Sequence, residues 1–196
     1  MMRVLLGILL ITFWGGAGPV NAGEGGSQEL RHKCFDSVAQ FAPSFDGPSL
    51  FDETYDVDAR GNSYSCVMYT NSEKVHVALK AFKEAIAFPS QSSIEKGIQF
   101  PFFANLQAED EAGRKRLKLT NWVEWKQFRD TYIQSSQVAV IMCSTVKTLT
   151  IVPDDGAMIG NGLVWLNGIG EDFGARVMNL SPVSDEAIVE TCKAAM

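Results

Sequence analysis

Three glycines in the stretch from Asp154 to Leu166 are the first candidates for chemistry: Gly156, Gly160 and Gly162. Glycine-rich loops can hold phosphate groups, but a P-loop ends in Gly-Lys-Ser or Gly-Lys-Thr, and a dinucleotide-binding loop opens a helix. Here the glycines lead into Val164–Leu166, whose residue types favour a buried strand. We therefore expect a tight turn or bulge that bends a sheet, with Asn161-Gly162 as its turn signal, in preference to a phosphate site.

Residues that could transfer protons are scattered along the chain. Asp154 and Asp155 form a carboxylate pair, although adjacent acids before a turn usually face solvent. Asp130 and Tyr132 are two positions apart on one predicted helix, so they point to different faces. His76 has no partner in the sequence, and no Gly-x-Ser-x-Gly motif occurs. The sequence therefore favours a non-enzymatic protein over an enzyme with a small pocket of the isomerase or hydratase type.

Aromatic residues are the clearest candidates for a ligand site. Trp122, Trp125 and Tyr132 recur on one face of a predicted helix, and Trp165 lies in the predicted strand. Aromatic residues at such spacings usually fill a core, but they also line ligand pockets. The predicted binding residues are Trp122, Trp125, Tyr132, Asp154, Asp155, Asn161 and Trp165.

The four cysteines, Cys34, Cys66, Cys143 and Cys192, predict two disulfides, because an even number of cysteines is typical of an exported chain. Three pairings are possible. We favour Cys34–Cys66 with Cys143–Cys192, because each bond then ties a flanking segment to its neighbour. No Cys-x-x-Cys motif occurs and the sequence has 2 histidines, so we expect no metal and no cofactor.

The first residues have the pattern of an export signal. Arg3 gives a positive start, an apolar run follows from Val4 to Trp14, and Val20-Asn21-Ala22 offers small residues for cleavage. The run is shorter than the ~20 apolar residues that span a bilayer. We expect cleavage after Ala22 and a periplasmic or secreted protein without stable membrane insertion; the alternative is an uncleaved helix at the membrane surface.

The formal net charge is −6, and one basic run interrupts the acidic chain. That run, Arg114–Lys118, stands among polar residues and fits a solvated hairpin tip or strand edge. Proteins that bind nucleic acid cluster lysine and arginine on a larger surface. No nucleic-acid partner is therefore expected.

Apolar spacing and capping residues predict the helices and strands. Ser27 caps a helix to about Phe41, Ser72 begins a helix that ends before Pro89, and Asn121 with Glu124 caps a third. Ser184 caps a last helix, and a short helical turn is expected over 90–97. The expected strands are Asn62–Thr70, Ile98–Leu106 with Pro101 at an edge or bulge, Leu117–Leu119, Thr148–Val152 and Ala175–Leu180. Residues 44–60 fit a loop or a poor strand, and Val138–Val146 fits a helix better than a strand.

Three segments together resemble exported bacterial proteins of the NTF2-like (cystatin-like) α+β class. They are the helix Val75–Ile86 with the following Ile98-Gln-Phe-Pro-Phe, the aromatic helix Trp122–Tyr132, and Asp155-Gly-Ala-Met-Ile-Gly-Asn-Gly-Leu-Val-Trp. The last is the most specific, and similar proteins have an asparagine near the end of the next strand, here Asn179. The resemblance covers about Ser72 to Leu180. It implies a curved antiparallel sheet packed on a long and a shorter helix, and an exported location, but no activity.

The chain is accordingly divided into a signal peptide (1–22), an N-terminal helix and strand flank (23–71), an NTF2-like core (72–182) and a C-terminal helix (183–196). We expect a non-enzymatic exported binding protein that holds an envelope protein or a small ligand. An inhibitor or immunity protein for an envelope enzyme is one form of this hypothesis, since an acidic chain would be steered towards a basic target. The alternatives are the small-pocket enzyme and a structural accessory of an exported assembly.

Overall fold

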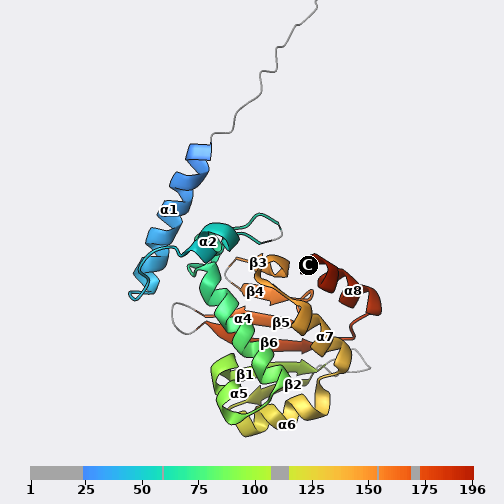
Figure 1. Cartoon of the computed structure of the whole chain (residues 1–196). Helices are drawn as coiled ribbons and strands as arrows, with labels where there is room; N and C mark the ends of the chain where they lie inside the picture. Colours follow the sequence, from blue (N-terminus) through green and yellow to red (C-terminus); the bar gives the residue numbers. More distant parts are fainter. Residues whose placement is uncertain (1–23, 59, 107–114, 154, 169–172) are drawn as a thin grey trace, which may run out of the picture.

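The computed structural model describes residues 24–58, 60–106, 115–153, 155–168 and 173–196, so the predicted signal peptide lies outside the described residues. The helices are α1 (Glu24–Phe41), α2 (Leu50–Tyr55), α3 (Tyr64–Met68), α4 (Ser72–Ala87), α5 (Gln91–Gly97), α6 (Trp122–Tyr132), α7 (Ser135–Cys143) and α8 (Asp185–Ala194), with a 3₁₀ turn at Val146–Thr148. The strands are β1 (Ile98–Leu106), β2 (Lys115–Leu119), β3 (Thr150–Val152), β4 (Gly156–Ile159), β5 (Val164–Asn167) and β6 (Gly174–Leu180) (Figure 1). No described helix is both long enough and apolar enough to cross a bilayer.

The six strands form one mixed sheet in the order β2-β1-β6-β5-β4-β3. All neighbouring pairs are antiparallel except β1 and β6, which are parallel. The α+β class is thus confirmed, but the prediction of a purely antiparallel sheet is wrong. Turn residues reveal antiparallel hairpins, whereas β1 and β6 are joined by a long crossover that leaves no local signal.

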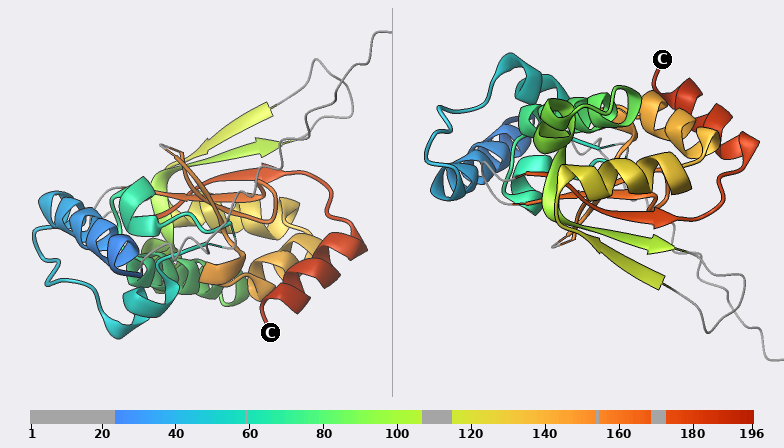
Figure 2. Two further views of the ribbon diagram at one scale, coloured as in Figure 1. Left: turned by 90° about the horizontal axis from the view of Figure 1, so that it is seen from above. Right: turned by 90° about the horizontal axis from the view of Figure 1, so that it is seen from below.

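Helices α4, α6 and α7 cover one face of the sheet (Figure 2). The predicted stripe of α4 is confirmed, because Val75, Leu79, Phe82 and Ile86 are all buried in the core. From α6, Trp125 meets the β1 residue Phe102 edge to face, with ring centroids 6.5 Å apart. Successive side chains of a strand point to opposite faces of a sheet. The face away from these helices is called the outer face below.

The β4–β5 hairpin confirms the turn predicted from the glycines. Gly160, Asn161 and Gly162 have φ values of 52°, 53° and 93°, and Leu163 N donates to Gly160 O at 3.2 Å. Positive φ is the reason these positions hold glycine and asparagine. The turn lets β5 reverse along β4, with Met158 opposite Trp165.

Three predictions in the N-terminal half of the chain need correction. The first helix begins at Glu24, so Ser27 lies within α1 and does not cap it. The strand predicted over Asn62–Thr70 is wrong: these residues form α3, which Ser63 caps by accepting from Cys66 N and which ends at Tyr69 with φ 52°. Alternating polar and apolar residues suggested a strand, but this short helix is held by its cap and by tertiary contacts. Residues 44–60 contain the short helix α2, capped by Ser49 and Asp52. Pro101 fits both parts of its prediction, because it lies at a register irregularity against β6 and just before Phe102, where the pairing with β2 begins.

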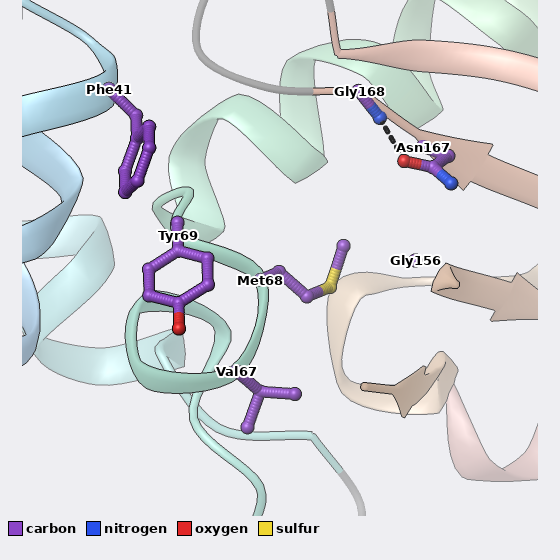
Figure 3. A pocket seen from close by; sticks show the side chains of 7 residues that line it. All are labelled: Phe41, Val67, Met68, Tyr69, Gly156, Asn167 and Gly168. Carbon is purple, nitrogen blue, oxygen red and sulfur yellow. Dashed lines mark hydrogen bonds between the residues drawn. The ribbon is translucent and has the colours of Figure 1, made fainter. Parts of the chain in front are cut away.

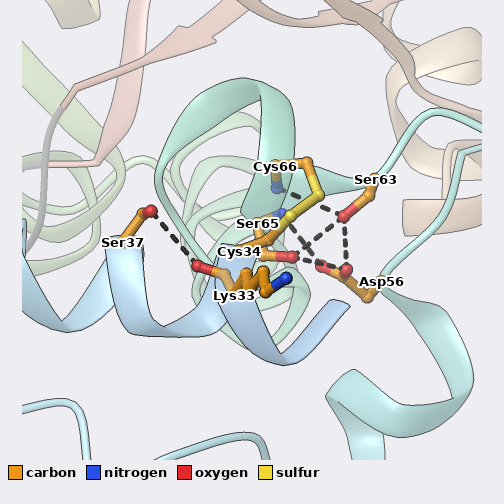
Figure 4. Close-up of a disulfide and its surroundings, with 7 residues drawn as sticks. All are labelled: Lys33, Cys34, Ser37, Asp56, Ser63, Ser65 and Cys66. Carbon is orange, nitrogen blue, oxygen red and sulfur yellow. Dashed lines mark hydrogen bonds between the residues drawn. A yellow bond between two sulfur atoms is a disulfide. The ribbon is translucent and has the colours of Figure 1, made fainter. Parts of the chain in front are cut away.

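Both favoured disulfides are present. Cys34–Cys66 ties α1 to α3 (Figure 4), and Cys143–Cys192 ties the end of α7 to α8. Helix α8 has no fully buried residue, and Ile188 is its partly buried contact with the core. The covalent bond therefore replaces much of the packing that would otherwise hold α8 in place.

Replacing Cys143 and Cys192 together by serine is expected to release α8 while the sheet stays folded. Hydrogen–deuterium exchange should become much faster at the α8 amides and stay unchanged in β1 and β6, because local opening follows local packing. Replacing Cys34 and Cys66 by serine is the control and should leave α8 protected. Equal protection of α8 in both double variants would contradict this dependence on the covalent bond.

Candidate binding face on the sheet

One row of side chains crosses the outer face through all six strands. The pairing register aligns Lys118, Phe103, Val177, Trp165, Met158 and Thr150, one residue from each strand. Their neighbours Phe102, Leu166 and Met178 point to the helices and are buried, whereas Phe103, Trp165 and Val177 are half-buried. The outer face therefore presents aromatic and aliphatic surface in the middle of the sheet.

A groove of about 460 Å³ lies over the middle of this row, at Phe103, Val177 and Trp165. Trp165 and Phe103 supply its apolar surface, and Arg116, Asp155 and Asn105 are among its polar lining residues. These side chains come from β1, β2, β5 and the turn before β4. The sheet thus brings together residues that are far apart in the sequence, as a binding site requires.

An amide relay fixes the floor of this groove. Asn105 Nδ2 donates to Asn179 Oδ1 at 2.7 Å, and Asn179 Nδ2 donates to Gly162 O at 2.6 Å. The relay ties β1 and β6 to the β4–β5 turn, which gives Asn179 a structural role. Because Asn105 uses its amide nitrogen here, its Oδ1 is left to accept a hydrogen bond from a ligand.

Two guanidinium groups border the groove. Arg116 lies over the ring of Phe103, with its Cζ 4.2 Å from the ring centroid. Arg176 is the extra residue of a bulge in β6, since Trp165 pairs with Val177 while Leu166 pairs with Ala175. Arg176 Nε donates to Asn167 O at 3.2 Å. Stacking and hydrogen bonding orient both groups, so a ligand would lose less side-chain entropy on meeting them.

The predicted site residues do not all come together. Asp155 and Trp165 both line the outer groove. Asn161 is exposed in the β4–β5 turn and lines a different groove beside α8. On α6, across the sheet, Trp125 is buried, Trp122 is half-buried and Tyr132 is 41 % exposed. Asp154 lies outside the described residues.

Sequence reasoning missed Phe103, Asn105, Arg116 and Arg176 as groove residues. The signal for the first two was available, because positions i and i+2 of a predicted strand share a face. The position of Arg116 over Phe103 depends on which strand pairs with β1, and that of Arg176 depends on a bulge. Neither can be read from local spacing.

The buried carboxylates lie in the N-terminal flank, away from this groove. Asp52, Asp56 and Asp58 are each no more than 5 % exposed. Asp56 accepts hydrogen bonds from the hydroxyls of Ser63 and Ser65 and from Ser65 N (Figure 4). Burial, with the nearby charges of Asp58 and Asp56, raises the pKa of Tyr64, whose hydroxyl donates to Val146 O at 2.7 Å. These acids accept from backbone and side-chain donors and hold the flank together.

A second, smaller pocket of about 280 Å³ lies between the N-terminal flank and the sheet (Figure 3). Phe41 and Tyr69 form one side of it, with ring centroids 5.2 Å apart, Gly156 and Asn167 lie on the other side, and the Met68 side chain lies between them. Its lining is mostly apolar. It could hold a small apolar group, but it lacks the convergent polar groups that give a site specificity.

No group of three or more histidine, cysteine, aspartate or glutamate side chains among the described residues could hold a metal ion. Comparison with the known protein families, with curated proteins and with solved structures finds no match to this chain. The outer groove therefore has to be interpreted from its own chemistry.

Proposed function

We propose that this chain is an exported binding protein that holds its ligand or partner on the outer face of the sheet. The observation behind this proposal is the groove in which Trp165, Asn105 and Arg116 converge on one face. Interior strands give such a face a rigid base, and rigid aromatic and arginine side chains contribute most of the free energy of binding at interfaces. The two disulfides support the exported location, because they form in oxidising compartments.

The rival proposal of a small-pocket enzyme gains little from the groove. General acid–base catalysis is helped by carboxyl or imidazole groups whose pKa is shifted by burial or by nearby charges. Beside Trp165, Asp155 is exposed, while the buried Asp52, Asp56 and Asp58 lie in the flank. Binding is thus the function that the arrangement supports best.

An inhibitor or immunity protein for a basic envelope enzyme is a narrower form of the proposal. It is supported by the net charge of −6. The outer groove itself, however, has Arg116 and Arg176 on its borders. A basic enzyme would then be attracted by acidic residues elsewhere on the chain. The inhibitor hypothesis therefore predicts that substitutions of the groove residues leave inhibition of the enzyme unchanged.

We also propose that the core belongs to the NTF2-like class. The support is the succession of α4, the β1–β2 hairpin, α6 and the strands β3 to β6, with the glycine turn between β4 and β5. An experimentally determined structure should superpose these elements on known domains of that class. A different strand order would refute the assignment.

The proposed function predicts that immobilised protein will retain a specific component of an envelope extract at low salt. Trp165→Ala should lower retention by about tenfold, because truncating an aromatic anchor costs 1–2 kcal/mol or more. Lys126→Gln, on the exposed side of α6, is the matched control and should retain the component fully. Equal retention by the wild type and Trp165→Ala, or no retained component, would refute the proposal.

A further inference from the structure

The outer groove extends beyond Trp165 into a second groove. The two share Asn105, Arg116 and Asn179, and their volumes are about 460 Å³ and 520 Å³. The second continues along β1 and β2 to Leu106 and Lys115. The combined surface runs from Asp155 to Leu106 and Lys115, where β1 ends and β2 begins. It is therefore suited to an elongated ligand.

The surface is locally basic on an acidic chain. Arg116 and Arg176 line the outer groove together with the single described acid Asp155, and Lys115 lines the second groove, whereas the whole chain has a net charge of −6. A planar guanidinium matches the two oxygens of a carboxylate. Arg116 already packs over the ring of Phe103, so its guanidinium would lose less side-chain entropy on binding such a partner. Charge complementarity thus favours an anionic ligand.

The apolar part of the groove includes the half-buried indole of Trp165 and the ring of Phe103. The indole of Trp165 is half-buried in the sheet, and among the described residues none accepts a hydrogen bond from its Nε1. A half-exposed indole offers an apolar ring face together with one N–H donor. A sugar ring is complementary to this surface, because it has an apolar C–H face and hydroxyl groups around its edge.

An extended peptide fits the same surface less well. The strands below the groove, β1, β6 and β5, each pair with neighbours on both sides, so most of their backbone N–H and C=O groups are already used. A peptide lying across them would bury its own amide groups with few partners, and unpaired buried amides are costly. Sugar hydroxyls need only the side-chain groups present, such as Asn105 Oδ1 and Asp155.

We infer that the outer groove binds an acidic oligosaccharide, one whose sugar units bear carboxylates. A sugar ring stacks on Trp165, its hydroxyls bond to Asn105 and Asp155, and its carboxylate pairs with Arg116. This inference rests on the proposed function, since it names the ligand class for the same face.

Isothermal titration of the purified protein with tetragalacturonate, at low ionic strength, tests the inference. Binding should weaken by about tenfold or more in Arg116→Gln and in Trp165→Ala, since each removes one strong contact. Arg116→Lys should recover only part of the affinity, because lysine lacks the planar fork. Lys126→Gln should bind as the wild type does. Arg116 is exposed, so its variants are expected to keep the fold, which circular dichroism would verify.

Two further probes separate the sources of binding. Maltotetraose, a neutral oligosaccharide, should bind at least about tenfold more weakly than tetragalacturonate, and tetraglutamate should bind more weakly as well. Tetraglutamate binding as tightly as the sugar would overturn the inference in favour of an acidic peptide. If tetragalacturonate does not bind while Trp165→Ala still abolishes retention of an envelope component, this inference fails and the proposed function stands. If tetragalacturonate does not bind and Trp165→Ala retains as much of the envelope component as the wild type, both the inference and the proposed function are refuted.

Discussion

Gly156→Ala is expected to lower the free energy of unfolding by about 4 kcal/mol, or to prevent folding. A Cβ atom at this position would lie 2.3 Å from the backbone oxygen of Leu166, which is fixed by pairing with β6. The residue also has a φ of +115°, which costs a non-glycine residue roughly 1–3 kcal/mol. Overpacking against rigid backbone adds roughly 1–3 kcal/mol more.

Chemical denaturation followed by circular dichroism measures this loss. Gly47→Ala is the matched control, because Gly47 has a similar φ of +107° but nothing within 4 Å of an added Cβ. The free energy of unfolding of Gly47→Ala should fall only by the cost of placing alanine at a positive φ. The difference between the two variants isolates the clash with β5. Equal losses would mean that β4 and β5 do not approach as closely as the structure has them.

Asp58→Asn is expected to destabilise the protein by about 3 kcal/mol at neutral pH. Asp58 accepts four hydrogen bonds: from Arg60 N, Asn62 N, Asn62 Nδ2 and Ile151 N, at 2.8, 2.9, 3.1 and 3.0 Å. The last joins the N-terminal flank to β3. An amide at this position would turn an NH₂ group towards donors, and each lost bond to a charged acceptor costs ~1.5–3 kcal/mol.

The same carboxylate predicts a dependence on pH. Burial alone would raise the pKa of Asp58, but the hydrogen bonds from Ile151, Asn62 and Arg60 outweigh it, so the pKa is lowered below 3.8. The unfolded chain then binds its proton at higher pH than the folded one, and folding favours the charged form. The stabilisation is complete above the unfolded pKa and disappears as pH falls through the folded value.

The difference in stability between wild type and Asp58→Asn should therefore be constant from neutral pH down to about pH 5 and should shrink below about pH 4. Denaturation midpoints measured across this range provide the test. Asp46→Asn, in an exposed loop, is the control and should change stability little at any pH. A difference that grows as the pH falls would have the wrong sign for this account.

The sequence predicted well those features that depend on local spacing. The apolar stripe of α4, the caps at Asn121 and Ser184 and the turn at Asn161-Gly162 all follow from residues within one or two turns of the chain. The favoured disulfide pairing is also present, although the sequence left the two other pairings open.

Long-range features were predicted poorly, for physical reasons. The parallel pairing of β1 with β6 and the bulge at Arg176 depend on which strands meet across the sheet. Helix α3 was mistaken for a strand because Tyr64 is held by a hydrogen bond to Val146, a residue that local patterns cannot identify. Of the predicted site residues, Asp155 and Trp165 share the outer groove, whereas Trp125 packs in the core.

The most direct test of the binding face is site-specific photocrosslinking in the producing cell. A benzophenone side chain would replace Val177, in the centre of the outer groove, or Lys126, on the exposed side of α6. The account predicts a discrete crosslinked product at position 177 and none at position 126. A product at position 126 alone would place the binding surface on the helices and contradict the account.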